Sequence, residues 1–303
     1  MSELKEMMTG LVGALVNPKR SPILRTPTDG GMDFEEVIIE AIDGVKLSAW
    51  FIPADSDKVI ICNHFSPGNR YGYPGHLEAF NTSGGFEVNF IPKYKALHDA
   101  GYNVLTYDMR NHGTSEEVND GISTVGALEW QDVVGSINYI RNREDTKDMK
   151  IGLQSNCMGA DATFIAIEKM PQLFEDIVAL VAVQPLSGEP MIERIVEGAG
   201  MGPEFVAPAL KAYDEALKEM TGFGVKRYDM PAVAPVVKMP TLLVQVKGDL
   251  MTKPYDMENI FKNLGTDDKK LHWIEGTPMR FHGYTYFSEQ PEEMVDWFNK
   301  HMK

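Results

Sequence analysis

The chain has 303 residues, of which 43% are apolar and 24% are charged, so it can bury a large core as an ordinary globular protein. Its formal net charge of −15 argues against a nucleic-acid partner and an anionic membrane surface, because phosphate groups are bound through patches of lysine and arginine. The two cysteines, Cys62 and Cys157, are too few for a disulfide framework and lack metal-ligand spacing with histidine. We therefore expect no metal and no cofactor.

The first twenty residues, MSELKEMMTGLVGALVNPKR, predict an amphipathic helix. Their apolar run is short, an acidic residue stands near its start, and no small-residue cleavage site follows, so a secretion signal is disfavoured. No apolar run in the chain is long enough to span a bilayer. These features predict a cytoplasmic protein with reduced thiols, and they leave open whether it forms a homodimer.

Strand and helix patterns alternate along the rest of the chain. Residues 34–54 alternate apolar and polar on both sides of an Asp-Gly pair, which predicts a hairpin. The β-branched run KVIICNHF then predicts a buried central strand, and PEEMVDWFNKHM predicts a closing amphipathic helix. The stretches expected to form the elements between them are IPKYKALHDAGYNVLTYD (helix, then strand), VGALEWQDVVGSINYIRNRE (helix), KIGLQ, IVALVAVQP, TLLVQVKGD and KKLHWIEG (strands).

This alternation predicts an α/β fold, with a mostly parallel sheet wrapped by helices on both faces. Reactive groups of such sheets gather at the carboxyl ends of the strands. Two stretches interrupt the pattern: a glycine- and aromatic-rich loop over residues 66–90, and a helical insertion over residues 186–239. We expect the insertion to form a cap over a pocket in a core of residues 1–185 and 240–303. Alternatively, its methionines and phenylalanines only pack it onto the core.

The stretch KIGLQSNCMGADATFIAI predicts a strand, a sharp turn and a helix, with Cys157 at the tip of the turn. In SNCMG, small residues stand two positions before and two positions after Cys157, where the turn leaves little room for side chains. Ser155 is the rival centre, but it would place Leu153 at a small position. An inert buried cysteine is the other alternative.

The pentapeptide SNCMG resembles the nucleophile elbow of α/β-hydrolases, which is usually G-x-S-x-G. The segment YDMRNHGTS is similar to the family's D-x-R-G-H-G-x-S, with Asn111 in place of one glycine. The chain is therefore identified as a member of the α/β-hydrolase superfamily over roughly residues 34–301, with a cysteine nucleophile. A cysteine elbow also resembles dienelactone hydrolases, polyhydroxyalkanoate synthases and acyl-CoA:amino-acid acyltransferases.

The resemblance implies a catalytic triad of Cys157, Asp249 and His282. In this family the acid ends a strand and the histidine follows it in the chain, and Asp249 ends the strand TLLVQVKGD. Two histidines follow: His272 lies within a strand pattern, whereas His282 lies after the strand, where we expect a loop. His282 is therefore the expected base. A cysteine–histidine pair can hold a standing thiolate.

The resemblance also implies an oxyanion hole made by the backbone N–H groups of Met158 and Phe65. His64, just before Phe65, is expected to be a structural hydrogen-bonding residue, and it is also a candidate for the substrate pocket. Arg70 and Arg280 are further pocket candidates, since either could contact an anionic group of a substrate. Surface solvation is the alternative for both.

These expectations favour a hydrolase that cleaves a carboxylic ester, lactone or thioester through an acyl-cysteine intermediate. The expected partner is a small acyl substrate. An acyltransferase that passes the same acyl group from a thioester to an amine, alcohol or thiol is the first alternative. A non-catalytic protein that binds a ligand or senses redox state is the second, although such a protein needs no complete triad.

Overall fold

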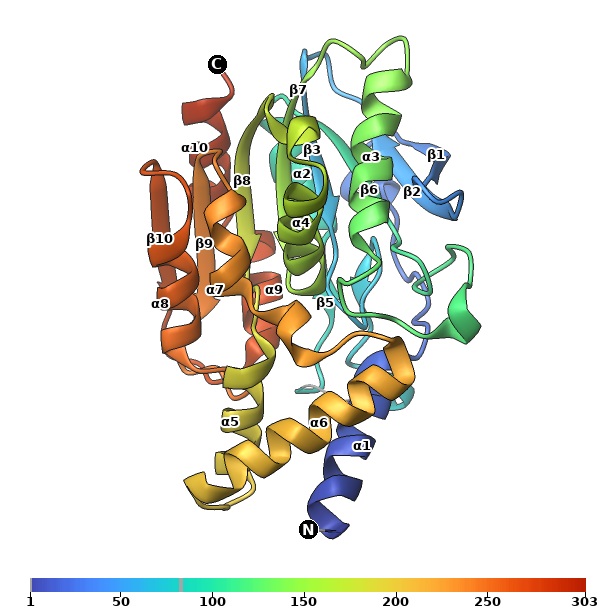
Figure 1. Cartoon of the computed structure of the whole chain (residues 1–303). Helices are drawn as coiled ribbons and strands as arrows, with labels where there is room; N and C mark the ends of the chain where they lie inside the picture. Colours follow the sequence, from blue (N-terminus) through green and yellow to red (C-terminus); the bar gives the residue numbers. More distant parts are fainter. Residues whose placement is uncertain (1, 82–83) are drawn as a thin grey trace.

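The computed structural model describes residues 2–81 and 84–303. At its centre is an eight-stranded sheet with the order β1-β2-β6-β3-β7-β8-β9-β10 (Figure 1). The hairpin β1–β2 is antiparallel, as is the pairing of β2 with β6, and all further neighbours are parallel. The strands are β1 (Glu35–Glu40), β2 (Lys46–Ile52), β3 (Lys58–Asn63), β6 (Asn103–Tyr107), β7 (Lys150–Asn156), β8 (Ile177–Val183), β9 (Thr241–Val246) and β10 (Lys269–Ile274). The predicted fold class is confirmed.

Helices cover both faces of this sheet, because its central strands are apolar on both sides. In β8, Leu180 and Ala182 join one hydrophobic cluster, and Ala179 and Val181 join the other. The first cluster packs under α3 (Trp130–Asn142), α4 (Met158–Lys169), α7 (Met230–Val233) and α8 (Pro254–Asn263). The second packs under α2 (Ile91–Asp99), α9 (Arg280–Glu289) and α10 (Glu292–His301).

The stretch between β8 and β9 is helical, as expected of residues 186–239. Besides α7 it contains α5 (Gly188–Gly198) and α6 (Val206–Thr221). The N-terminal helix α1 (Ser2–Val16) packs against α6, and the two helices cross beyond the lower edge of the sheet in Figure 1. The buried residues of α1 are spaced four apart and form one stripe: Leu4, Met8, Val12 and Val16. The sequence predicted this helix but not its partner.

Smaller elements complete the chain. A two-stranded antiparallel sheet of β4 (Gly72–Tyr73) and β5 (Val88–Asn89) lies in the loop expected over residues 66–90, of which residues 82 and 83 are outside the described part. Short 3-10 turns are found at Pro27–Gly30, Glu78–Phe80, Asn119–Gly121, Pro171–Phe174, Pro203–Phe205, Val225–Tyr228 and Ala234–Val236. Within the described ranges, no helix combines the length and apolar character needed to cross a membrane.

The parallel strands β3, β7, β8 and β9 end at the same edge of the sheet, the edge that faces α1, α5 and α6 in Figure 1. His64, Cys157 and Gln184 follow the first three of these strands directly, and Asp249 follows β9 three residues later. The fold therefore gathers the polar residues of four strand ends beneath the helices.

Candidate active site

Cys157 forms the turn between β7 and α4, with φ of 48° and ψ of −115°. A non-glycine residue with positive φ is strained unless its surroundings hold it. Here the Cys157 N–H donates to the Val183 carbonyl (2.8 Å), and its carbonyl accepts from Ala160 and Asp161 (2.8 and 2.9 Å). The side chain lines a cavity and is 7% exposed. The sulfur is thus presented at the first turn of α4.

The small residues around this turn are required by close packing. A Cβ added at Gly159 would lie 2.6 Å from the His64 carbonyl oxygen. The Ser155 hydroxyl is fully buried, where it accepts from Asn63 Nδ2 (2.8 Å) and lies 2.9 Å from Thr163 Oγ1. Ser155 therefore braces β7 against β3 and α4, and Cys157, not Ser155, stands at the tip.

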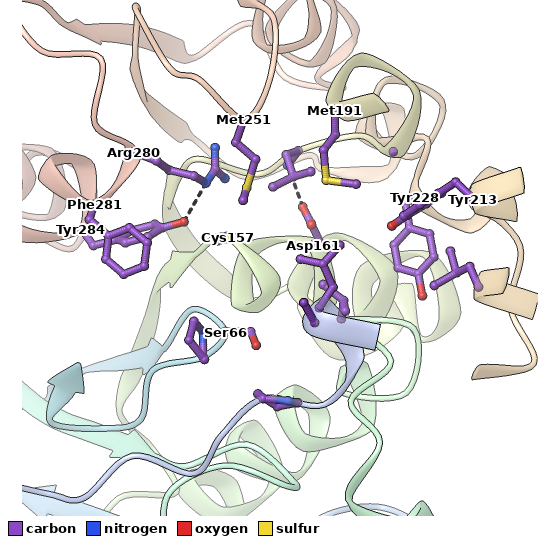
Figure 2. Close-up of a pocket in the computed structure, with 18 residues that line it drawn as sticks. Ser66, Cys157, Asp161, Met191, Tyr213, Tyr228, Met251, Arg280, Phe281 and Tyr284 are labelled. Carbon is purple, nitrogen blue, oxygen red and sulfur yellow. Dashed lines mark hydrogen bonds between the residues drawn. The ribbon is translucent and has the colours of Figure 1, made fainter. Parts of the chain in front are cut away.

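The cavity in front of Cys157 measures about 160 Å³ and is largely apolar (Figure 2). Its wall combines the strand ends with α9, the helices after β8 and the N-terminal helix. The lining residues are Ala14, Leu15, Pro18, Ser66, Pro67, Val125, Cys157, Asp161, Leu186, Gly188, Met191, Tyr213, Leu217, Tyr228, Met251, Arg280, Phe281 and Tyr284. A dry apolar cavity of about 150 Å³ holds a molecule the size of benzene, so this one suits a short acyl group.

Arg280 and Tyr284 project from α9 toward Cys157 (Figure 2). They are four residues apart and so share one face of the helix. The Arg280 Nε donates to the Tyr284 hydroxyl (2.8 Å), and both side chains interact with the Cys157 thiol. Burial alone lowers the pKa of Arg280, but Tyr284, Asp249 and Cys157 together raise it well above its ordinary value. Arg280 is therefore a permanent cation beside the sulfur.

Asp249 is the buried ion-pair partner of Arg280. Its carboxylate forms an ion pair with Arg280 Nη1 and accepts from Gln245 Nε2 (3.0 Å) and the Met251 N–H (2.9 Å). The Arg280 Nη2 donates to the Gln184 carbonyl, while Gln184 Nε2 donates to the Arg280 carbonyl (2.7 Å). These bonds fix the guanidinium, which interacts with both Asp249 and Cys157, the two residues that a histidine was expected to connect.

The structure does not bring His282 to Cys157. The expected loop is the helix α9, and a position two residues after Arg280 lies about 200° around a helix. The His282 Nδ1 is 2.6 Å from Thr277 Oγ1, and its ring stacks on Phe86 with centroids 4.9 Å apart. No histidine is among the described residues that line the cavity. A base role for His282 stays a prediction that these contacts do not support.

His272, the other histidine considered, lies in β10, where it pairs with Glu293 (2.7 Å).

Gly283 explains how α9 comes so close to the strand ends. A Cβ there would lie 2.5 Å from the Gln184 side chain, so glycine lets the helix approach β8. The packing of α9, rather than a loop, selects which side chains reach the cavity.

The two backbone amides proposed for the oxyanion hole have no hydrogen-bond acceptor among the described residues. Within the described residues, neither the Phe65 N–H nor the Met158 N–H donates a hydrogen bond. Met158 is the first residue of α4, where a backbone N–H has no partner in its own helix. The Phe65 ring is fully buried and stacks on Tyr284 with centroids 4.0 Å apart. Both amides stay predictions for this role.

His64 and Arg70, two of the three pocket candidates, do not line the cavity. The His64 Nε2 accepts from the Met109 N–H (2.9 Å), so its Nδ1 carries the proton and donates to the Phe65 carbonyl (2.8 Å). Burial lowers the pKa of His64 well below its ordinary value. Arg70 forms a buried ion pair with Asp108 and lies over the Trp50 ring. Only the third candidate, Arg280, reaches the cavity.

Sequence reasoning missed two further polar residues of the cavity, Tyr284 and Asp161. Both follow a recognised residue by four positions on a helix, since Tyr284 follows Arg280 and Asp161 follows Cys157. That spacing was the available signal.

Within the described part of the chain, no group of three or more acidic, histidine or cysteine side chains could hold a metal ion.

The sheet, the elbow and the helices at the strand ends define an α/β-hydrolase fold. The structure is similar to that of the Pyrococcus furiosus esterase Pf2001, with a TM-score of 0.71 and 22% identity over 95% of this chain and 99% of that one. It also resembles a dienelactone hydrolase from Anabaena variabilis, with a TM-score of 0.57 and 18% identity over 90% of this chain and 99% of that one.

Sequence comparison adds little to this likeness. No protein-family model matches the chain. An uncharacterised protein of Bacillus subtilis, YqkD, is 26% identical over 141 residues, which is 46% of this chain. The match spans 42% of that relative's length. These comparisons establish the fold, and the activity has to be argued from the site.

Proposed function

We propose that the protein is an acyl hydrolase that forms a thioester with its substrate at Cys157. The observation that carries the proposal is the position of the Cys157 sulfur, at a strained turn, on the wall of an apolar cavity, with Arg280 beside it. An inert core cysteine would need none of these features. The thiolate is the nucleophile in this reaction, and the Arg280 cation and the first turn of α4 lie beside it.

The first step joins the sulfur to the substrate. The Cys157 thiolate attacks the acyl carbonyl, the new C–S bond forms, and the bond to the leaving group breaks with its electron pair going to the leaving group. The Met158 and Phe65 N–H groups are the proposed donors to the carbonyl oxygen as it becomes negative. Such donors are worth about 3 kcal/mol each where one has been removed.

The side chains at the site favour a particular kind of leaving group. An alkoxide needs a proton as it departs, and an imidazole is the usual donor, yet none of the described lining residues is a histidine. A thiolate, or the enolate released from an activated lactone, departs as a stable anion without one. The proposed substrates are therefore thioesters and activated esters or lactones with a short acyl group.

Release of the acyl group decides between two activities. In hydrolysis, water attacks the acyl-Cys157 carbonyl, the C–S bond breaks, the thiolate is restored, and one proton passes to solvent. Without an imidazole on the cavity wall to activate that water, hydrolysis is slow and the thioester persists. This observation favours a second candidate function, acyl transfer to an amine or thiol that attacks more readily than water.

Intact-protein mass spectrometry tests the proposal. The wild-type protein is exposed to acetyl, butanoyl and octanoyl thioesters and to the matching aryl esters, in parallel with Cys157→Ala. We expect an added mass equal to the acyl group on the wild type only, with the short chains giving more adduct than octanoyl. Cys62→Ala is the matched control, since its thiol is buried away from the cavity. An adduct that survives Cys157→Ala, or none on any protein, contradicts the proposal.

The same adduct separates the two activities. After excess substrate is removed, the acyl-enzyme is divided between buffer alone and buffer containing a primary amine or a thiol. Loss of adduct at the same rate in all samples, with free acid as the product, identifies a hydrolase. Faster loss with an amide or new thioester as the product identifies a transferase.

A further inference from the structure

One carboxyl group inside the cavity has no role in the chemistry proposed above. Asp161 is 2% exposed and lines the same cavity as Cys157. One of its oxygens accepts from the Leu186 N–H (3.2 Å), which is drawn as a dashed line in Figure 2. Among the described residues, its other oxygen makes no hydrogen bond. Asp161 is not among the residues whose fully enclosed side-chain atoms lack a partner, so this oxygen is open to the cavity, where a bound polar group can become its partner.

Among the described residues, no cation forms an ion pair with Asp161. Arg280 acts on it electrostatically, but that guanidinium is already paired with Asp249. Asp256, a second buried acid, acts on Asp161 with the opposite sign. Burial is the dominant effect and raises the pKa of Asp161 well above its ordinary value. Asp161 therefore binds a proton more readily than an ordinary aspartate, and its protonated form can both donate and accept a hydrogen bond.

The position of Asp161 relative to the sulfur is set by α4. The Asp161 N–H donates to the Cys157 carbonyl (2.9 Å), so the two residues are one turn apart on the helix. Cys157 is the N-cap residue, outside the helix itself, and both side chains line the same cavity. One helical turn rises about 5.4 Å, which a chain of roughly four bonds spans, so a ligand group bound to Asp161 would stand roughly four bonds from a carbonyl that meets the sulfur.

A second unpaired polar group lies on the wall formed by α6. The Tyr213 side chain is 5% exposed, lines the cavity and makes no hydrogen bond through its hydroxyl to any residue in the described ranges. Tyr228, also on the wall, uses its hydroxyl to donate to the Thr124 carbonyl (2.6 Å). The otherwise apolar cavity therefore offers polar groups at two places, the Cys157–Arg280 end and the Asp161–Tyr213 wall.

We infer that Asp161 is a specificity residue, which binds acyl groups carrying a hydroxyl or an amine about four bonds from the reacting carbonyl. A purely apolar acyl chain would leave the Asp161 carboxyl group without a hydrogen-bond partner. Such a chain should therefore bind less tightly than one that carries a polar group. The inference rests on the proposed function for the position of the carbonyl. Its binding test does not, because it needs no reaction at Cys157.

Three amides of matched shape test this inference: pentanamide, 4-hydroxybutanamide and 4-aminobutanamide. Each is titrated by calorimetry into Cys157→Ala, which removes the nucleophile. We expect at least one of the polar amides to bind about tenfold more tightly than pentanamide. Adding Asp161→Leu should abolish that preference. Adding Asp161→Asn should retain the preference for 4-hydroxybutanamide, because the asparagine side chain can still bind its hydroxyl group. It should remove the preference for 4-aminobutanamide, because the ammonium group needs a carboxylate.

Asp256→Asn in the same background is the matched control, because Asp256 is a buried acid that does not line this cavity. It should leave the preference intact. Circular dichroism of each variant shows whether it is folded before titration. Pentanamide binding as tightly as both polar amides overturns the inference, as does a preference that survives Asp161→Leu. Either result leaves the acyl-adduct experiment unaffected, so the two proposals fail separately.

Discussion

Arg280 and Asp249 form an ion pair in which the two side chains are only 6% and 2% exposed. Arg280 also interacts with the Cys157 thiol, so the acid that was expected to orient an imidazole orients a guanidinium instead. A guanidinium is always protonated and cannot accept a proton. It can stabilise a negative sulfur but cannot act as a base, and this distinction separates the site from a cysteine–histidine–aspartate triad.

Replacing Arg280 by glutamine should slow the alkylation of Cys157 by iodoacetamide. At pH 7 we expect roughly a tenfold loss of rate, because a positive charge about 4 Å from a negative sulfur is worth between about 1 kcal/mol in water and about 4 kcal/mol near a protein surface. His282→Gln, two residues away on the same helix, should leave the rate unchanged. The rates are measured by mass spectrometry across pH 5 to 10. A rate that falls with His282→Gln instead would restore the histidine as the partner of Cys157.

Breaking the Arg280–Asp249 pair should destabilise the fold. Arg280→Met leaves a buried carboxylate without its cation, for which we expect a loss of about 3–5 kcal/mol in the free energy of unfolding. The double variant Arg280→Met with Asp249→Leu should recover much of that loss, since it removes both charges. Urea unfolding followed by circular dichroism measures the wild type, Arg280→Met, Asp249→Leu and the double variant. Full additivity of the two single losses would show that the residues are not coupled.

The elbow should be intolerant of even one added methyl group. Gly159→Ala places a Cβ 2.6 Å from the His64 carbonyl oxygen, and we expect it to cost about 1–3 kcal/mol as the backbone shifts. Gly10→Ala is the control, because a Cβ there meets no atom within 4 Å in helix α1. Alanine should stabilise that position by about 0.5–1 kcal/mol. Equal effects at the two positions in chemical denaturation would contradict this view of the turn.

Lys93 should make stability rise with pH in the alkaline range. Burial lowers the pKa of Lys93 from 10.5 to about 8, although its ammonium donates to Gln154 Oε1 (2.7 Å) and lies over the Phe90 ring. Between those pH values the unfolded chain binds a proton that the folded chain does not, so stability increases from pH 8 toward pH 10.5. Below pH 8 the buried charge costs up to about 3 kcal/mol.

Lys93→Met should therefore stabilise the protein at pH 7, and its advantage over the wild type should vanish above about pH 11. The comparison is made as a difference because Cys62 acts in the opposite sense. Burial raises the pKa of the Cys62 thiol to about 12, so that group lowers stability as pH rises above about 9. Lys95→Met, an exposed change on the same helix, serves as the control. An advantage that does not vary with pH would show that the pKa of Lys93 is the same in the folded and unfolded states.

The sheet was predictable because each strand is marked by the residue types within its own short stretch of sequence. Runs such as KVIICN and IVALVAV are β-branched and apolar throughout, which is what burial between two layers of helices requires. The elbow was equally predictable, because a strand with a small residue comes just before Cys157 and a helix begins just after it. These features depend on neighbours within a few residues.

The partners of Cys157 were harder to predict because they depend on α9. Apolar residues fall on every side of this helix, so its sequence shows no single stripe and was taken for a loop. In a loop the direction of a side chain is free, and His282 was a fair expectation. In a helix the direction is fixed by position, so Arg280 and Tyr284 face the sulfur while His282 faces Phe86.

Helix α1 supplies Ala14 and Leu15 to the cavity wall but packs on α6, which lies far along the chain. A ribosome releases α1 first, and the residues of α6 follow on the order of ten seconds or more later at ordinary rates of synthesis. During that interval the apolar stripe of α1 has no native surface to cover. The cavity in front of Cys157 is therefore closed among the last events of folding. Until then, the apolar stripe of α1 has to be kept from binding other proteins.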